Sequence, residues 1–273
     1  MIDLIKLHAT NHIQQRCVQA EKMIVKNKNL DIPHGNTVIW RYVGLDKFLD
    51  LLISQELFFS NAAKMSDKYE GLIPKRNQDY LLKSIKSNGL SREDAEIERQ
   101  IRLREIHSLK ELTLLNCWTI SQSESYALWK IYLGGSKSGV AIRTTVAKLT
   151  KAIKKGNDTF KEDIFISKVK YTDFIKEEPE NRFNVITTKN KFYDYEKELR
   201  LFIFHYPQSE GGINPPYNVS IGRRLKVDLN ELIDEIYLSP FVGKWFDKTI
   251  IEILNKVNPT LSQKIKNSEI LDE

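Results

Sequence analysis

KNKFYDYEKELRLFIFHY, at residues 189–206, combines the strongest strand signal of the chain with a pair of acidic residues. Residues 201–204 are a run of branched and aromatic side chains without Gly or Pro, which predicts a strand that begins at Glu196. Successive side chains of a strand point to opposite faces. The prediction therefore places Glu196, Glu198 and Arg200 on one face, opposite the apolar side chains.

The two carboxylates on this face require compensation, because like charges two residues apart on a strand repel each other. Arg200 is one candidate for the compensating cation. A bound metal, or a catalytic role in which one carboxyl group holds a proton, would serve as well. The alternative without a function is a solvated strand face beside an ordinary ion pair, and the sequence leaves both interpretations open.

Length and composition indicate a folded protein that buries a sizeable core. The chain has 273 residues, of which 41% are hydrophobic and 29% charged, as in soluble globular proteins. Its formal net charge of +6 favours a polyanionic partner or substrate. The chain has only two cysteines, no secretory leader pattern and no apolar run long enough to span a membrane. We therefore expect a cytoplasmic location and no membrane partner.

The order of elements predicts an α+β fold in a single domain at residues 37–258. This domain is expected to have a split, mostly antiparallel sheet with a central cleft and helices packed outside. A strongly charged helical insertion is predicted at 77–112. Residues 1–36 are predicted to form an N-terminal helical extension, and residues 259–273 a polar, frayed tail.

Charged residues lie in and after the first predicted strands, where functional loops are often found. Arg41 lies in the middle of the apolar strand 37–43. A half-buried guanidinium there requires an anion, which is either a protein carboxylate or a ligand phosphate. The polar loop after the next strand carries Asp67 and Glu70, which alternatively cap a short helix.

Residues 112–144 predict a strand, a short aromatic helix at 126–132 and a second strand after a glycine-rich turn. This order would place an aromatic wall over a strand end. Cys117 lies among apolar residues without a group nearby that would lower its pKa, so a buried structural role is favoured over a nucleophile. The next helix, at 146–157, carries a basic patch for which a solvated face is the default interpretation.

Five short blocks follow each other between about residue 37 and residue 257. They are Trp40-Arg41-Tyr42, Ser66-Asp67-Lys68-Tyr69-Glu70-Gly71, Asn116-Cys117-Trp118-Thr119, Leu128-Trp129-Lys130-Ile131-Tyr132-Leu133-Gly134 with Gly139-Val140, and Lys191 with Tyr195-Glu196-Lys197-Glu198-Leu199-Arg200. In this order the blocks resemble a widespread bacterial family known as domain of unknown function 2971. The chain differs from the family pattern at Ser66 and Lys68, where Asn and Pro are usual. The resemblance implies that the site includes Tyr42, Asp67, Glu70, Lys191 and Arg200.

A second resemblance is to the core of ADP-ribosyltransferases, which carries an arginine on an early strand, a hydroxyl residue on a middle strand and a Glu-x-Glu pair on a late strand. The matching positions are Arg41, Thr119 or Ser121, and Glu196 with Glu198. This resemblance implies a cleft that binds NAD as a substrate, with Arg41 on a phosphate and Ser121 in support.

The same resemblance implies roles for aromatic and acidic residues. Trp129 or Tyr132 would lie against the nicotinamide. Glu198 would stabilise the positive charge that develops on the ribose, and Glu196 would orient a nucleic-acid or protein acceptor. Cytoplasmic bacterial proteins with such cores are often toxins or phage-defence effectors, which gives an expectation for this chain by analogy.

Two other functions are compatible with these residues. In the first, the chain is a non-catalytic ligand- or partner-binding module in which Arg41 and the acidic pair form a structural ion network. In the second, Asp67, Glu70, Glu196 and Glu198 hold Mg²⁺ in a metal-dependent nuclease, because Mg²⁺ prefers carboxylate oxygens.

Overall fold

The computed structural model describes residues 24–65, 89, 91–157, 162–173, 181–205 and 221–270. The strands of its main sheet are β1 (Ile24–Val25), β2 (Val38–Gly44), β3 (Glu56–Asn61), β4 (Thr113–Ile120), β5 (Gly139–Thr145), β6 (Ile164–Lys168), β9 (Glu198–Phe204), β10 (Gly222–Lys226), β11 (Glu235–Leu238) and β12 (Ile265–Lys266). A separate two-stranded sheet consists of β7 (Lys170–Thr172) and β8 (Thr188–Asn190).

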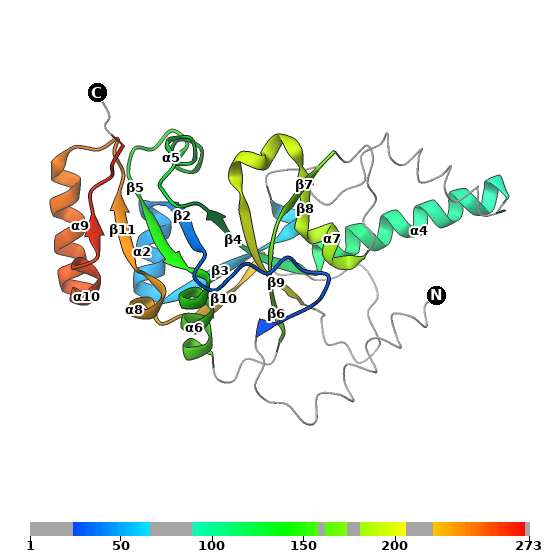
Figure 1. Ribbon diagram of the computed structural model, residues 1–273, viewed down its shortest axis with the longest axis horizontal. Helices are drawn as coiled ribbons and strands as arrows, with labels where there is room; N and C mark the ends of the chain where they lie inside the picture. Colours follow the sequence, from blue (N-terminus) through cyan, green and yellow to red (C-terminus); the bar gives the residue numbers. More distant parts are fainter. Residues whose placement is uncertain are drawn as a thin grey trace.

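In the main sheet the strands follow the order β1-β6-β9-β4-β2-β5-β11-β12. Figure 1 labels the strands of this path from β6 to β11. Outside this path, β3 pairs with β4 and β10 pairs with β3. Among the described strands of this sheet, only β1–β6 and β11–β12 are parallel pairs. The predicted α+β class with a mostly antiparallel sheet is therefore confirmed.

The helices pack around this sheet, and several of them begin at residues whose side chains cap them. They are α2 (Leu45–Ser54), α4 (Arg92–Glu111), α5 (Tyr126–Leu133), α6 (Val146–Gly156), α7 (Arg182–Thr187), α8 (Leu229–Leu232), α9 (Lys244–Val257) and α10 (Pro259–Ser262), with short 3₁₀ helices η1 (Ala62–Lys64) and η2 (Lys191–Glu196). Ser125 and Thr145 cap α5 and α6 by accepting backbone N–H groups of the first turn. None of the helices in the described part of the chain has the length and apolar character needed to cross a membrane.

Both faces of β9 are buried, which makes it the central strand of the core. Leu199, Leu201 and Ile203 pack on one face in a cluster shared with α2, α6, α8 and α9. Phe202 and Phe204 point to the other face and pack with α7. The predicted alternation of side chains along this strand is therefore confirmed for its apolar residues.

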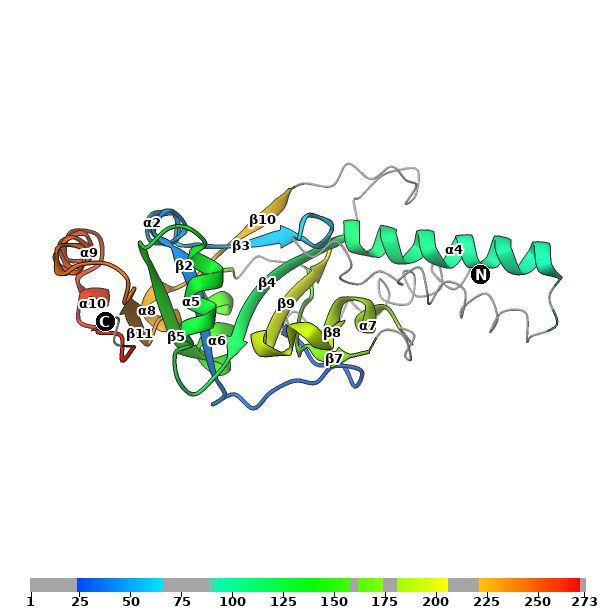
Figure 2. The same ribbon diagram turned by 90° about the horizontal axis from the view of Figure 1, so that it is seen from above.

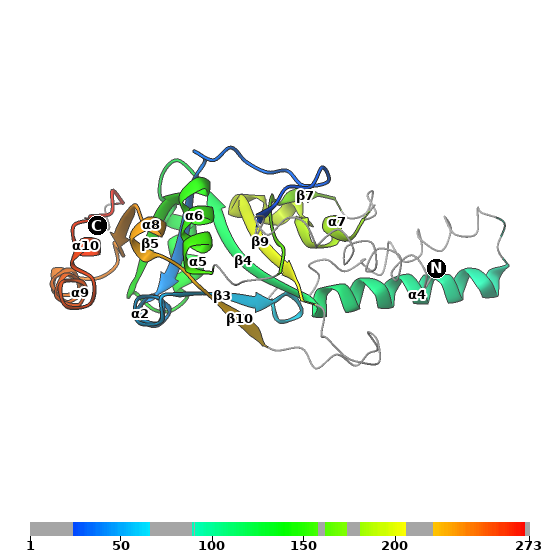
Figure 3. The same cartoon turned by 90° about the horizontal axis from the view of Figure 1, so that it is seen from below.

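The sheet is split beside β4, as the sequence predicts. β2 pairs with β4 only through Ile39 and Trp40 among the described residues, and β3 pairs with β4 through Ser60 and Asn61. Between these two contacts β4 has no strand partner on this side, so the sheet forks there. Figure 3 shows the β3–β10 pair leaving the main sheet.

Asn116 on β4 bridges the gap to β3 in this fork. Its Nδ2 donates a hydrogen bond to the carbonyl oxygen of Phe58 on β3 at 3.0 Å, and its Oδ1 accepts one from the indole Nε1 of Trp118 at 2.8 Å. The bond to Phe58 replaces a missing ladder bond between β3 and β4, and the bond from Trp118 satisfies two polar groups that are removed from water.

A long charged helix, α4, extends away from the sheet before the chain enters β4 (Figures 1 and 2). Ser91 caps it, its Oγ accepting a hydrogen bond from the backbone N–H of Asp94 at 3.1 Å. The predicted helical insertion is thus confirmed for its second part, and residues 77–88 lie outside the described residues.

The predictions for the two ends of the chain need correction. Residues 24 and 25 form β1 beside β6, where a helix was predicted, and residues 1–23 lie outside the described residues. The prediction of frayed residues after Pro259 is also wrong. There β12 adds to the edge of the sheet beside β11, and Leu261 is fully buried in the main core. The buried Leu261, the β11–β12 pairing and the hydrogen bonds of Ser268 and Glu269 to Glu124 hold a segment that is polar in composition.

Substitution Leu261→Ala tests this docking of the C-terminal segment. We expect it to lower the free energy of unfolding by about 2 to 5 kcal/mol, because it removes buried methyl groups and leaves a cavity. The exposed neighbour Thr260 is the matched control, and Thr260→Ala should change stability by less than about 0.5 kcal/mol. Urea unfolding of both variants makes the comparison, and equal stability of Leu261→Ala and the wild type would contradict the docked arrangement.

Candidate functional site

A group of buried charges lies at the start of β9. Arg200 Nη2 donates a hydrogen bond to Glu198 Oε2 at 2.8 Å. Lys189 Nζ lies 2.6 Å from Glu196 Oε2 and 3.6 Å from Glu198 Oε2. Glu198 and Arg200 are only 4% and 1% exposed. Two cations thus compensate two carboxylates away from water, and we call these four residues the charge cluster.

The local backbone brings Glu196 to this cluster by a route that differs from the predicted one. The strand begins at Glu198, and Glu196 is the last residue of η2. Between them Lys197 has a left-handed conformation with φ 41°, which ends η2 and breaks the alternation of a strand. The prediction of a strand from Glu196 is therefore wrong, although Glu198 and Arg200 do share a face.

Lys189, on β8, is the member of the cluster that sequence reasoning missed. The sequence blocks pointed to Lys191, but its Nζ pairs with Asp173 at 2.9 Å and its side chain is half exposed. Lys189 is buried and bridges both glutamates. The sequence signal that could have indicated Lys189 was the presence of two lysines, Lys189 and Lys191, in one stretch. Of these two, only Lys189 lies in a strand beside η2.

Burial and neighbouring charges shift the pKa values of the cluster in opposite directions. Burial raises the pKa of Glu198, while Lys189 and a hydrogen bond from Cys117 act to lower it. Burial by itself would lower the pKa of Lys189, but Glu198 and Glu196 raise it well above its usual value. The ammonium group of Lys189 therefore stays charged and keeps the two carboxylates together.

Two further polar side chains contact Glu198. The hydroxyl of Tyr171 accepts a hydrogen bond from the backbone N–H of Glu198 at 2.8 Å. Burial and the hydrogen bond to Glu198 raise the pKa of the Cys117 thiol, although Arg41 and Lys189 act in the opposite direction. Charges that lower this pKa are thus present, against the prediction, but burial outweighs them. Cys117 remains a protonated donor, as a structural role requires.

Arg41 lies on β2 at the fork of the sheet. Its guanidinium carbon is 5.6 Å from the ring centroid of Trp118. Burial lowers the pKa of Arg41, while Cys117 and Tyr132 act to raise it, so the guanidinium lies near both groups. Its Nη1 is buried and has no hydrogen-bond partner among the described residues. Cys117 and Tyr132 therefore lie within electrostatic range of both Arg41 and Glu198.

Two aromatic residues of the predicted site belong to the core. Tyr42 is buried, and its hydroxyl accepts a hydrogen bond from the backbone N–H of Ser125 at 2.7 Å. Trp129 is 0% exposed and donates its indole N–H to Glu124 Oε2 at 2.9 Å. No ring face of Trp129 is open to a ligand, so the expected contact with nicotinamide is wrong for this residue.

Tyr132 differs from Trp129 on the same helix, because it lies on the exposed side of α5. It is 45% exposed and stacks on Tyr42 with ring centroids 6.3 Å apart. Burial of its hydroxyl end and the nearby charges of Glu198 and Glu196 raise its pKa. Tyr132 therefore spans from the surface to the charge cluster.

The side chain of Ser121 forms a hydrogen bond within its own turn. Its hydroxyl donates to the carbonyl oxygen of Ser123 at 2.6 Å, and its carbonyl accepts the indole N–H of Trp40 at 3.0 Å. The alternative hydroxyl residue, Thr119, is buried and pairs with Glu198 across β4 and β9. Of the two positions, Thr119 is therefore the one beside the charge cluster.

The remaining predicted features do not add a ligand site. Asp67 and Glu70 lie outside the described residues. Among the described residues, no group of three His, Cys, Asp or Glu side chains is placed to hold a metal ion. The lysines of α6 form ion pairs with acidic residues around α8, which neutralises the basic patch: Lys148 with Asp234, Lys151 with Glu231, and Lys155 with Asp228 and Glu231.

Comparison with known proteins gave no match of any of the three kinds searched. No family model matches the chain, no curated protein matches its sequence, and no solved structure matches its fold. The function must therefore be inferred from the geometry of the charge cluster and Arg41.

Substitution Glu198→Gln tests the buried ion pair. We expect it to lower the free energy of unfolding by about 3 to 5 kcal/mol, because it leaves the buried guanidinium of Arg200 without its carboxylate. Glu252→Gln on α9 removes an exposed carboxylate and should have an effect below about 0.5 kcal/mol. Denaturant unfolding at pH 7 distinguishes the variants, and wild-type stability of Glu198→Gln would contradict the pairing.

Lys189 predicts a dependence of stability on alkaline pH. Its pKa is raised in the folded state above the ordinary value of 10.5, so its stabilising contribution is complete below that pH. As the pH rises from 10.5 towards the raised value, the contribution is lost. The difference in unfolding free energy between wild type and Lys189→Met should therefore shrink over this range.

Lys191→Met is the matched control for this experiment, because Lys191 is an exposed lysine two residues away. The difference between wild type and Lys191→Met should be small throughout. A difference for Lys189→Met that stays constant above pH 10.5 would show that the ammonium group does not hold the cluster together.

Proposed function

We propose that the chain binds NAD through a phosphate contact of Arg41 and transfers ADP-ribose from it, as an ADP-ribosyltransferase-like enzyme. The observation that supports this proposal best is the buried Nη1 of Arg41, which has no hydrogen-bond partner among the described residues. A buried guanidinium nitrogen without a partner is unfavourable, and an anionic ligand would satisfy it. The planar guanidinium also suits a phosphate group.

The carboxylates of the charge cluster already have other partners, which favours a ligand anion over a protein anion for Arg41. Glu198 is bonded to Arg200, and Glu196 is bonded to Lys189. None of the ion pairs found among the described residues includes Arg41. Of the two anions that the sequence leaves open, a ligand phosphate is therefore better supported.

The charge cluster supplies groups that suit the transfer step. NAD would supply a ribose that becomes positively charged as the nicotinamide leaves. The carboxylates of Glu196 and Glu198 would stabilise that charge. Lys189 and Thr119 hold or flank these carboxylates, and of the predicted pair Trp129 and Tyr132 only Tyr132 is exposed.

The acceptor in this proposal is a nucleic acid or a protein. The formal net charge of +6 favours a polyanion, although the lysines of α6 are already paired with carboxylates. By analogy with the resembled bacterial families, we propose a cytoplasmic toxin or phage-defence effector.

A second candidate is a non-catalytic binding module of the same kind. It is favoured by one observation, the near-complete burial of Glu198 in its ion pair with Arg200. A carboxylate that is neutralised by a buried arginine stabilises a substrate cation less than a free one would. In this candidate Arg41 still binds an anion, but no nicotinamide is released.

A metal-dependent nuclease is less well supported. The ammonium group of Lys189 lies within 4 Å of both glutamates, at the position that Mg²⁺ would take between them. The other two carboxylates of that hypothesis, Asp67 and Glu70, lie outside the described residues.

Substitution Arg41→Lys tests the phosphate contact. We expect it to weaken NAD binding roughly tenfold or more, because a lysine keeps the charge but loses the planar pair of donors. Nicotinamide riboside, which has no diphosphate, should bind the variant and the wild type equally. The matched control is Arg224→Lys on β10, where the arginine is exposed and paired with Asp50. Isothermal titration calorimetry measures all three proteins.

The same samples separate the candidate functions. Release of nicotinamide from NAD by the wild type supports the enzyme, and NAD binding without release supports the non-catalytic module. Absence of NAD binding to the wild type would overturn the proposal, as would a wild-type affinity of Arg41→Lys.

A further inference from the structure

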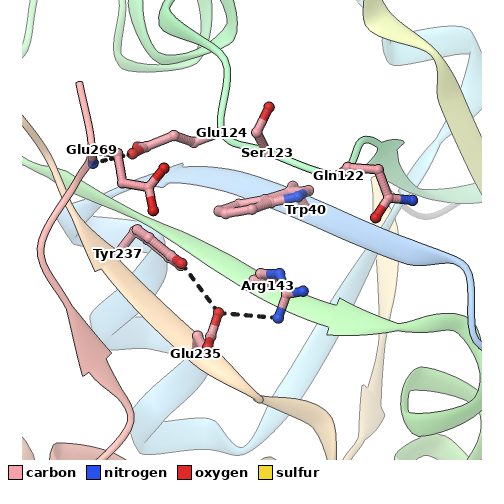
Figure 4. A pocket seen from close by; sticks show the side chains of 8 residues that line it. All are labelled: Trp40, Gln122, Ser123, Glu124, Arg143, Glu235, Tyr237 and Glu269. Carbon is pink, nitrogen blue, oxygen red and sulfur yellow. Dashed lines mark hydrogen bonds and ion pairs between the residues drawn. The ribbon is translucent and has the colours of Figure 1, made fainter.

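A separate pocket of about 230 Å³ lies across β2, β5 and β11, away from the charge cluster (Figure 4). Trp40, Arg143 and Glu235 form its floor. They are direct neighbours in the register of the three strands, with Trp40 opposite Arg143 and Arg143 opposite Glu235. Tyr237 follows on β11 with its ring centroid 4.9 Å from that of Trp40.

The rim of the pocket is fixed by Glu124, which precedes α5. Its Oε2 accepts hydrogen bonds from the Trp129 indole at 2.9 Å and from the Ser268 hydroxyl at 2.8 Å. Its Oε1 accepts the backbone N–H of Glu269. The C-terminal segment is thus held beside the pocket at two places. Its strand β12 pairs with β11, and its residues Ser268 and Glu269 bind Glu124. The backbone of Glu269 is therefore fixed at the rim of the pocket.

The charges inside the pocket are unbalanced. Arg143 Nη1 lies 3.1 Å from Glu235 Oε2, and the hydroxyl of Tyr237 donates to the same oxygen at 3.2 Å. This pairing neutralises Arg143. Glu124 adds a second carboxylate, and the side chain of Glu269 points into the pocket (Figure 4). No hydrogen bond or ion pair of the Glu269 carboxylate is found in the described part of the chain.

We propose that this pocket binds a small organic cation with a guanidinium or primary amine group, which pairs with the carboxylate of Glu269. One cation and three carboxylates line the pocket, so a positive ligand restores its charge balance and an anion would be repelled. The aromatic rings of Trp40 and Tyr237 also line the pocket, and an organic cation is attracted to such rings. This site and the phosphate contact of Arg41 therefore take ligands of opposite charge.

Agmatine, which carries both a guanidinium and an amine, is the probe for this site. We expect calorimetry to detect its binding to the full chain, and substitution Glu269→Gln to weaken it roughly tenfold or more, because a hydrogen bond between two charged groups is lost. Glu269 is exposed, so the variant should fold, and its thermal unfolding checks this. Glu252→Gln, which removes an exposed carboxylate from α9, should bind agmatine as the wild type does.

Acetyl-arginine amide is titrated in parallel as a second probe, which represents an arginine side chain of a peptide, whereas agmatine represents a free amine. Binding of either probe at this site supports the proposal. Absence of binding of both probes to the wild type would overturn it. Binding that is unchanged in Glu269→Gln, or a preference for butyrate over agmatine, would also overturn it.

Discussion

The structure around β9 depends on the burial of charge. Taking a carboxylate or an ammonium group out of water is strongly unfavourable, and it is tolerated only where opposite charges and donors surround it. Lys189 meets this requirement for two glutamates at once, and Arg200 completes it for Glu198. This constraint fixes how η2 and the small sheet of β7 and β8 sit on β9. The side chains of Cys117 and Tyr132 follow from it, because each contacts or faces the same carboxylates.

The parts that the sequence predicts correctly are those with a local signal. The alternation of Leu199 and Leu201 with Arg200 has a period of two, which depends only on the strand itself. The helices and most strands are likewise set by periodicity and caps. The split of the sheet also agrees with the prediction, because the polar Asn116 and the charged Arg41 lie where an unbroken ladder would have been apolar.

The parts that the sequence does not predict depend on contacts between distant segments. Glu196 reaches Lys189 because Lys197 adopts a left-handed conformation, which no periodicity indicates. Trp129 and Tyr132 lie on one aromatic helix, where the sequence has no polar contrast to show which ring faces inward. Leu261 is buried because β11 offers an edge to the segment that follows it. Each of these outcomes is a property of the assembled core.

The fork in the sheet has a mechanical consequence. The half with β6, β9 and β4 and the half with β2, β5 and β11 are joined between β4 and β2 by the pairs at Ile39 and Trp40. A ladder this short resists rotation less than the seven-residue ladders on either side. We expect most of the flexibility of the sheet to lie at this short β2–β4 ladder, which we call the seam. The two halves of the sheet would then twist relative to each other as rigid units. Amide hydrogen exchange along β2 and β4 would measure it. Arg41 lies on the seam, and an anion bound there would restrict the rotation of one half of the sheet relative to the other.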